Sequence, residues 1–275
     1  MSEIVPTTIL LSFDIEEFDV PREHGVDIPF DRSVAISVEG ATRILDLLKR
    51  HGVRATFFCT ADFADAAPGI IDRIVGENHE VASHGCSHWR FETGDLALSR
   101  RRLEALAGCR VEGYRQARMM PVADGDVRDA GYVYNSSLNP TFIPGRYMHL
   151  STPRTYFMKD GVLQIPSSVT PWLRFPLFWL ACHNLPMWLY RALVRRTANY
   201  DGYLSVYFHP WEFFELNDHP ELKMPFIIRH NSGQKLVDRL DSLITELRNR
   251  GCRFESYGDF ARRIIKEQGR TGDGE

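Results

Sequence analysis

The sequence lacks the features that define several large classes of protein. Its 275 residues contain five widely spaced cysteines with no Cys-x-x-Cys pair, which argues against a disulfide framework or a zinc-finger module. Cys59 and Cys252 lie in apolar, strand-like runs and are predicted to be buried free thiols. The net charge is −3 with no basic tract, so no nucleic-acid partner is expected.

Targeting and membrane-spanning patterns are also missing. The first six residues have neither the basic region nor the apolar stretch of a signal peptide. The apolar run Pro171–Arg196 is broken by Pro176 and Pro186, and neither piece reaches the roughly 20 residues of a spanning helix. With free thiols and no export signal, a cytoplasmic location is expected.

What the chain does contain is an alternation of strand and helix patterns. Strands are predicted at 9–13, 55–59, 80–83, 111–115, 203–208 and 252–254, and helices at 34–50, 68–75, 95–106 and 235–250. Repeated β-then-α units favour a parallel sheet or barrel, in which functional residues collect at the carboxyl ends of the strands. We therefore expect a single α/β domain over 1–275, with an apolar insert at about 166–200.

Polar clusters follow the first and third predicted strands. Asp14 and Glu16 end the first strand, and because residues i and i+2 of an extended segment share a side, both should face one site. Glu17 should then point away, toward solvent or a basic partner. His84 and His88 follow the third strand. Two imidazoles and a carboxylate suit a catalytic, zinc-like metal, so the sequence predicts a metal-dependent hydrolase.

Each of these signals also has a purely structural interpretation. Taken alone, His84 and His88 are typical of two exposed polar residues around a turn. The carboxylates of Asp14 and Glu16 are typical of a solvated strand end. However, Asp14 follows apolar residues, where an unpaired charge would be costly, and a metal ion would remove that cost.

The order of these motifs resembles the polysaccharide deacetylases of the NodB-homology type, carbohydrate esterase family 4. Four segments are similar to that family's aspartate, histidine, arginine and final histidine motifs: Ser12–Glu16, Ser83–His88, Gly113–Arg115 and Tyr207–Glu212. The resemblance spans residues 9–212 in order. It implies a distorted (β/α)7-type barrel.

The resemblance also implies a metal centre. Glu16, His84 and His88 would be the metal ligands. This ligand set suits zinc (Zn2+), while Co2+, Ni2+ and Mn2+ remain alternatives because availability decides among such metals.

The same resemblance implies three catalytic residues. Asp14 would be the base that activates water, and Arg115 would orient it. His209 would be the general acid that protonates the leaving nitrogen. The alternative for His209 is a histidine bonded into the scaffold beside Trp211 and Glu212.

Three positions depart from the family pattern. Ile15 occupies the place of a second aspartate, and Gln116–Arg118 follows the arginine where a proline or aromatic residue is usual. The aspartate that normally pairs with the arginine would fall near Asn135. A neutral amide there should hold Arg115 less firmly and leave Asp14 as its nearest counter-charge.

The implied reaction is hydrolysis of an N-acyl group, with acetyl as the first choice, from an amino sugar of a surface glycan or its precursor. Without an export signal, a lipid-linked or nucleotide-linked sugar is the expected substrate, and O-deacylation by the same groups stays open. Two alternatives are a hydrolase of small cyclic amides or ureides, and a sugar-binding pseudoenzyme.

The apolar insert has two interpretations of its own. In the first, its large side chains belong to core helices and to a lid over the barrel mouth, since aromatic residues mostly pack inward. In the other interpretation, 171–196 is an amphipathic surface in peripheral contact with the inner membrane face, as its tryptophans and terminal arginines suit an interfacial helix.

Overall fold

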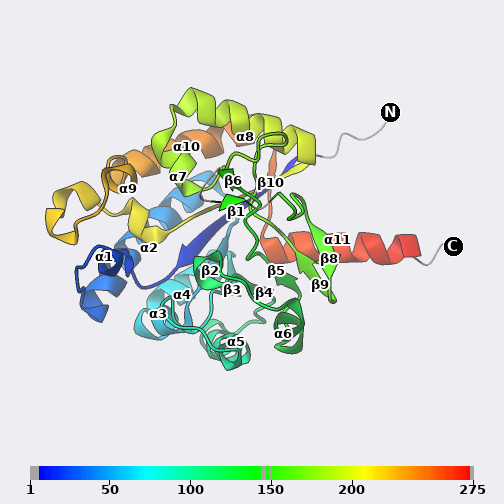
Figure 1. Cartoon of the computed structure of the whole chain (residues 1–275), viewed down its shortest axis with the longest axis horizontal. Coiled ribbons are helices and arrows are strands. Elements are labelled where there is room, and N and C mark those ends of the chain that lie inside the picture. The colour runs from blue at the N-terminus through cyan, green and yellow to red at the C-terminus, as the bar shows by residue number, and fades with distance from the viewer. Residues whose placement is uncertain (1–5, 144–146, 149, 273–275) are drawn as a thin grey trace.

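The centre of the molecule is a curled sheet covered on its outside by helices, as a computed structural model shows for residues 6–143, 147–148 and 150–272 (Figure 1). The sheet contains β1 (Thr8–Ile15), β2 (Thr56–Cys59), β3 (Glu80–Ser83), β4 (Gly113–Tyr114), β5 (Tyr134–Asn135), β8 (Phe157–Lys159), β9 (Val162–Gln164), β10 (Tyr203–Phe208) and β11 (Arg253–Phe254). Their order is β10-β1-β2-β3-β4-β5-β9-β8, with β11 beside β1. Residues 1–5, most of the amino-terminal segment discussed above, lie outside the described residues.

All neighbouring strands run parallel except β8, which lies antiparallel to β9. Just beyond β9, Ser168 donates its backbone N–H to the Ser205 carbonyl of β10 at 2.8 Å. In return, the Ser205 N–H donates to Ser168 Oγ at 2.9 Å. These two bonds join the two ends of the curl, and the predicted distorted (β/α) barrel is confirmed.

The helices are α1 (Val20–Glu23), α2 (Phe30–His51), α3 (Ala61–Ala66), α4 (Pro68–Gly76), α5 (Gly94–Ala107), α6 (Asp124–Asp129), α7 (Trp179–Asn184), α8 (Met187–Asp201), α9 (Phe226–Arg229), α10 (Gln234–Asn249) and α11 (Tyr257–Gly272). Long helices follow the 3.6-residue apolar period: α2 buries Ile44, Leu45 and Leu48 and ends at Gly52, whose φ of +59° favours glycine. Short 3-10 turns are η1 (Ala117–Met119), η2 (Pro210–Phe213), η3 (Leu216–Asp218) and η4 (Pro220–Leu222). A separate hairpin pairs β6 (Phe142–Ile143) with β7 (Tyr147–Met148).

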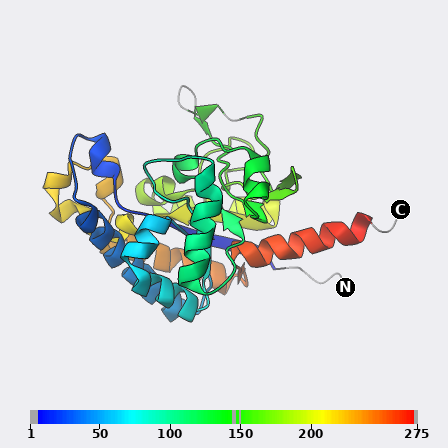
Figure 2. The ribbon, with the colours of Figure 1, turned by 90° about the horizontal axis from the view of Figure 1, so that it is seen from below.

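Two apolar clusters pack against the two faces of the curled sheet. The larger one lies between the sheet and the outer helices. The smaller one fills the barrel interior, where Leu10, Phe58 and Tyr134 meet Tyr257 and Phe260 of α11. Helix α11 enters the body at this end and projects away from it (Figure 2). Because Phe260 stacks on Tyr203, the first residue of β10, α11 covers the amino ends of the strands and leaves the carboxyl ends for a site.

The apolar insert is partly core and partly surface. Phe178 and Tyr190 are buried, as an inward-packing segment requires. Trp172, Leu173 and Trp188 are 71%, 77% and 72% exposed, so the expectation that large side chains pack inward is wrong for these three. Within the part of the chain that the structure describes, no helix has the length and apolar character needed to cross a membrane.

The thiols agree with the sequence expectation. All five cysteines are free, with Cys59 buried in β2 and Cys252 partly buried before β11.

Candidate active site

Three side chains from the ends of β1 and β3, the two strands that flank β2, meet at the carboxyl end of the barrel. Glu16 follows β1, while His84 and His88 lie in the loop after β3. Oε2 of Glu16 is 3.3 Å from Nε2 of His84 and 3.1 Å from Nε2 of His88. All three residues are buried, and one ligand atom of each lies within 4.8 Å of the others. The structure thus brings together the three predicted metal ligands.

The second polar atom of each of these side chains is held by a different neighbour. Nδ1 of His84 donates to the Arg115 carbonyl at 2.8 Å, and Nδ1 of His88 donates to Asp19 Oδ1 at 2.9 Å. Trp211 Nε1 donates to Oε1 of Glu16 at 3.2 Å. These bonds set the tautomer of both histidines, so that each Nε2 presents its lone pair to the common centre.

The donor set fits a divalent cation. Within the described residues, Oε2 of Glu16 is buried without a hydrogen-bond donor, although it lies between two ring nitrogens. Burial alone would raise the pKa of Glu16, but the neighbouring imidazoles of His88 and His84 outweigh it and lower the pKa to about 2. The carboxylate is therefore ionised at neutral pH, which is the form that binds a metal. A carboxylate and two imidazoles are zinc ligands, and the orphaned oxygen gains a partner when a cation is bound.

Asp14 lies beside the ligands and is paired with Arg115. The Arg115 guanidinium is fully buried and donates to Oδ1 of Asp14 at 2.5 Å. It also donates to Ser136 Oγ at 3.0 Å and to Tyr257 OH at 3.2 Å, while its plane lies 3.9 Å from the centre of the Phe58 ring. No hydrogen bond within the described residues involves Oδ2 of Asp14, which leaves this oxygen available to accept a proton.

Asn135 does not take the place of the family's arginine partner. Its Oδ1 accepts from the Ser137 N–H at 3.1 Å, and its Nδ2 donates to Asp124 at 3.4 Å. The neighbouring Ser136 contacts Arg115 instead. Apart from Asp14, the side chains that accept from Arg115 within the described residues are therefore hydroxyl groups. Asp14 is the only acidic residue that pairs with Arg115 in the described part of the chain.

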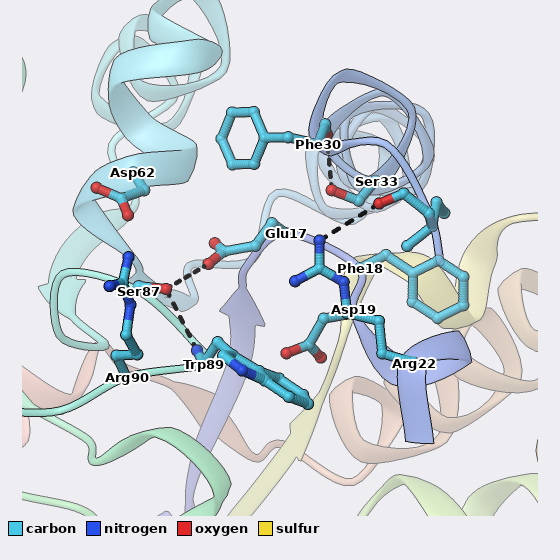
Figure 3. Close-up of a pocket in the computed structure, with 11 residues that line it drawn as sticks. Glu17, Phe18, Asp19, Arg22, Phe30, Ser33, Asp62, Ser87, Trp89 and Arg90 are labelled. Atoms are coloured by element: carbon cyan, nitrogen blue, oxygen red, sulfur yellow. Dashed lines mark hydrogen bonds between the residues drawn. The ribbon is translucent and has the colours of Figure 1, made fainter. Parts of the chain in front are cut away.

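Glu17 points away from the ligands, but the expectation of a solvent or basic partner is wrong. Its carboxylate is buried and accepts from Thr60 Oγ1 at 2.8 Å, Ser87 Oγ at 3.1 Å and the His88 N–H at 3.0 Å. Figure 3 shows Glu17 directed at Ser87, and both residues line a cavity of about 190 Å³ together with Trp89. Glu17 therefore holds in place the loop after β3 that carries His84 and His88.

Asp19 is a site residue that sequence reasoning missed. One of its oxygens holds His88, and the other accepts from Arg118 Nη2 at 3.3 Å. Arg118 has a φ of +59°, which is unusual for a residue with a side chain. Arg118 thus places a cation beside the carboxylate that holds His88. The position of Asp19, a few residues beyond Glu16, was the available signal.

His209 stands on the opposite side, at the end of β10. Its ring stacks on Trp211 with centroids 5.0 Å apart, and its Nδ1 donates to Glu212 Oε1 at 2.7 Å. Burial alone would lower the pKa of His209, but the bond to Glu212 and the charges of Glu16 and Asp14 raise it to about 9. Nδ1 of His209 is thus bonded to the surrounding protein, as the alternative interpretation of this histidine expected. No hydrogen bond within the described residues involves Nε2, which is the nitrogen that a proton donor would use.

Comparisons with known proteins agree with this geometry. The polysaccharide deacetylase family model matches residues 19–106, a segment that includes His84 and His88. The resemblance to the NodB-homology polysaccharide deacetylases is confirmed. A peptidoglycan-N-acetylglucosamine deacetylase of Bacillus cereus is 43% identical over 51 residues, which is 18% of each chain. A chitooligosaccharide deacetylase of Bradyrhizobium is 36% identical over 77 residues, or 26% of this chain and 35% of that one.

The aligned segments therefore span about a fifth to a third of these curated deacetylases. Solved structures extend the likeness of fold over the whole barrel. A Mycobacterium smegmatis protein assigned to the polysaccharide deacetylases has a TM-score of 0.68 at 16% identity, covering 98% of this chain and 93% of its own. The allantoinase PuuE has a TM-score of 0.64 at 15% identity, covering 94% and 91%. A Bacillus anthracis pseudoenzyme of carbohydrate esterase family 4 has a TM-score of 0.53 at 15% identity, covering 93% and 66%.

Proposed function

We propose that this chain is a metal-dependent hydrolase that removes an N-acyl group, in the first instance acetyl, from an amino sugar of a surface glycan or of its lipid-linked or nucleotide-linked precursor. The observation that carries the proposal is the buried Oε2 of Glu16, which lies between the Nε2 atoms of His84 and His88 and has no hydrogen-bond donor in the described part of the chain. The names of the relatives, deacetylases of peptidoglycan and of chitooligosaccharides, support the class of substrate.

Glu16, His84 and His88 would hold the metal, with Zn2+ as the first choice and Co2+, Ni2+ or Mn2+ as alternatives. When bound, such an ion polarises a carbonyl oxygen and makes water more acidic, the two effects that amide hydrolysis requires.

Asp14 would take the proton of the attacking water. Arg115 occupies Oδ1 of this carboxylate and leaves Oδ2 free to accept, which fixes the direction of the proton transfer. The arginine itself is held by Ser136 and Tyr257, so the base is oriented by residues from two other elements.

His209 would supply the proton that the leaving nitrogen needs. Glu212 raises the pKa of His209 above its ordinary value, which favours the protonated imidazole, and the same carboxylate holds Nδ1–H so that Nε2–H can be donated. A base and an acid held by different partners are the arrangement that cleavage of an amide bond needs.

The test is a panel of substrates offered to the metal-loaded protein. It contains N-acetylglucosamine oligomers, nucleotide-linked and lipid-linked N-acetylated amino sugars, an O-acetylated sugar and allantoin. Acetate release from one of the N-acetylated sugars, absent from His84→Ala, is the expected result. Turnover of allantoin alone would instead favour a ureide hydrolase. Sugar binding without turnover of any compound would favour a pseudoenzyme.

We further propose that 171–196 makes peripheral contact with the inner face of the membrane, where a cytoplasmic protein would meet a lipid-linked sugar. Trp172, Leu173 and Trp188 are exposed, and Arg195 and Arg196 lie on the same helix as Trp188. Vesicles of anionic lipid should co-sediment with the parent and much less with Trp172→Asp/Leu173→Asp. Equal sedimentation, or none in either case, would leave the segment as a lid only.

A further inference from the structure

One buried carboxylate serves two histidines. Oε1 of Glu212 accepts from both the backbone N–H and Nδ1 of His209, each at 2.7 Å. Oε2 of the same carboxylate accepts from Nε2 of His183 at 3.0 Å. The side chains of Glu212 and His183 have no exposed surface. The contacts therefore form a continuous chain from His183 through Glu212 to His209.

His183 comes from the insert, on helix α7. Trp179, one turn earlier on that helix, packs edge-on against both histidine rings, with centroids 5.7 Å from His183 and 5.6 Å from His209. Hydrogen bonds from outside the insert also hold α7 next to His183. Asn231 donates to the His183 carbonyl at 2.6 Å, and Arg239 donates to the Cys182 carbonyl at 2.8 Å. The insert thus brings His183 to Glu212 on a well-anchored helix.

The surroundings of His183 indicate which nitrogen carries its proton. Nδ1 is buried and has no hydrogen-bond partner among the residues that the structure describes, whereas Nε2 faces the Glu212 carboxylate. A proton on Nδ1 would be a buried N–H without an acceptor. His183 therefore donates from Nε2 to the Glu212 carboxylate.

A carboxylate held through one oxygen only can pivot, and its unpaired oxygen would pay the cost of desolvation. We propose that His183 is a positioning residue for the proton donor: by holding Oε2 of Glu212, it keeps Oε1 on Nδ1 of His209 and so aims Nε2 of His209 at the substrate. The inference rests on the proposed role of His209 as general acid. On this proposal, α7 contributes a residue that orients the proton donor, in addition to covering the site.

The first experiment compares two replacements of His183. In His183→Gln the side-chain amide can place an N–H close to the position of Nε2, while His183→Leu removes the donor and keeps an apolar filling. We expect kcat to fall about 10–100-fold in His183→Leu with KM changed by less than about 2-fold, because misalignment of the donor affects the chemical step. His183→Gln should recover most of kcat.

Asn184→Ala is the matched control. Asn184 follows His183 on α7 and ties the helix to the Leu180 and Ile227 carbonyls without contacting Glu212. Its replacement should leave kcat unchanged. A loss in Asn184→Ala as large as that in His183→Leu, or a His183→Gln variant no better than His183→Leu, would overturn the proposal in favour of a general requirement for α7.

A double-mutant cycle separates positioning from structure. If His183 acts through Glu212, then His183→Leu should cost less than about 3-fold in kcat when it is added to Glu212→Gln, because the contact it supports is already weakened. Equal losses in the parent and in the Glu212→Gln background would show that the two residues act independently, and would contradict the proposal.

A measurement without substrate distinguishes failure of this inference from failure of the proposed function. Nitrogen-15 NMR of the imidazole rings in the protein as purified should show His183 protonated on Nε2 and bare on Nδ1, and His209 bonded through Nδ1. These assignments need neither turnover nor a variant that folds. A His183 ring protonated on Nδ1 would overturn the inference even if acetate release is observed. The predicted tautomers in a protein without hydrolase activity would support the geometry while the proposed function fails.

Discussion

The two sides of the candidate site are built differently. On one side, called here the metal-ligating side after its proposed role, Glu16, His84 and His88 follow strands of the central sheet, and each is held by its own partner. On the proton-donating side, His209 lies at the start of a 3-10 turn and shares one carboxylate with a histidine of the insert. The first side can lose one support and keep the others, whereas the second depends on a single chain of contacts.

The largest effect on turnover is expected from replacing Asp14, the proposed base. Asp14→Asn should retain the metal, because Asp14 is not among the three clustered ligands, yet turnover should fall about 10²–10⁴-fold without a group to accept the proton. Metal content and kcat measured on the same sample test this. Loss of the metal would show that Asp14 is itself a ligand.

Stability is a confounding factor in that experiment. Arg115 is fully buried, and removal of its counter-charge leaves an uncompensated cation at a cost of about 3–5 kcal/mol. The double variant Asp14→Asn/Arg115→Met removes both charges. It should recover part of the lost free energy of unfolding but none of the turnover, which isolates the chemical role of Asp14.

A smaller effect is expected at Asp19, which does not belong to the candidate ligands but holds one of them, His88. Asp19→Asn replaces the charged acceptor of the His88 Nδ1–H by a neutral one and should weaken zinc affinity about 10–100-fold. Calorimetric titration measures the change. Glu23→Gln is the control, because Glu23 pairs with Arg118 at 2.7 Å but does not contact His88. Equal losses in both variants would point to Arg118 instead of the bond to His88.

The proton-donating side should respond to pH. The histidine pKa is about 6.5 in an unfolded chain, and His209 is raised to about 9 in the folded, metal-free protein. A raised pKa stabilises the fold fully below the unfolded value, and that stability disappears as pH rises through the folded value. The metal-free protein should therefore lose up to roughly 3 kcal/mol between pH 6.5 and pH 9, since one pKa unit equals about 1.4 kcal/mol.

Chemical denaturation at several pH values tests this dependence. His209→Gln should flatten it over the same range. Bound metal should also reduce it, because a cation neutralises the Glu16 charge that helps to raise the pKa of His209. An unchanged slope in His209→Gln would assign the dependence to other groups.

The smallest effect concerns the support of the His209 loop. A Cβ added at Gly40 of α2 would lie 1.8 Å from the backbone oxygen of Pro210, the residue after His209. Gly40→Ala should lower the free energy of unfolding by about 1–3 kcal/mol and reduce kcat as the loop shifts. Gly76→Ala, at an open position at the end of α4, should be neutral or stabilising by up to about 1 kcal/mol. Equal effects at both glycines would contradict the role of this close approach.

The metal-ligating side was predictable because two simple regularities apply to it. Side chains alternate along a strand, which put Asp14 and Glu16 on one side, and parallel strands end at one edge, which brought His84 and His88 to them. The strand predictions at 80–83 and 203–208 match the structure residue for residue. The same regularities made the barrel predictable.

The supporting residues were not predictable because their contacts depend on loop paths. Asp19 contacts His88, which lies 69 positions further along the chain. His183 contacts Glu212 from the apolar insert, 29 positions away. Glu17 was expected to meet solvent or a cation, but the loop after β3 folds over it and supplies hydroxyl and amide donors. No period or propensity in the sequence specifies such contacts.

The central claim is that Glu16, His84 and His88 bind one catalytic metal ion. The most direct measurement is a calorimetric titration of Zn2+ into metal-stripped parent protein and into the His84→Ala/His88→Ala variant. The account predicts about one equivalent bound by the parent and none by the variant. No binding to the parent, or one equivalent bound by the variant, would contradict it.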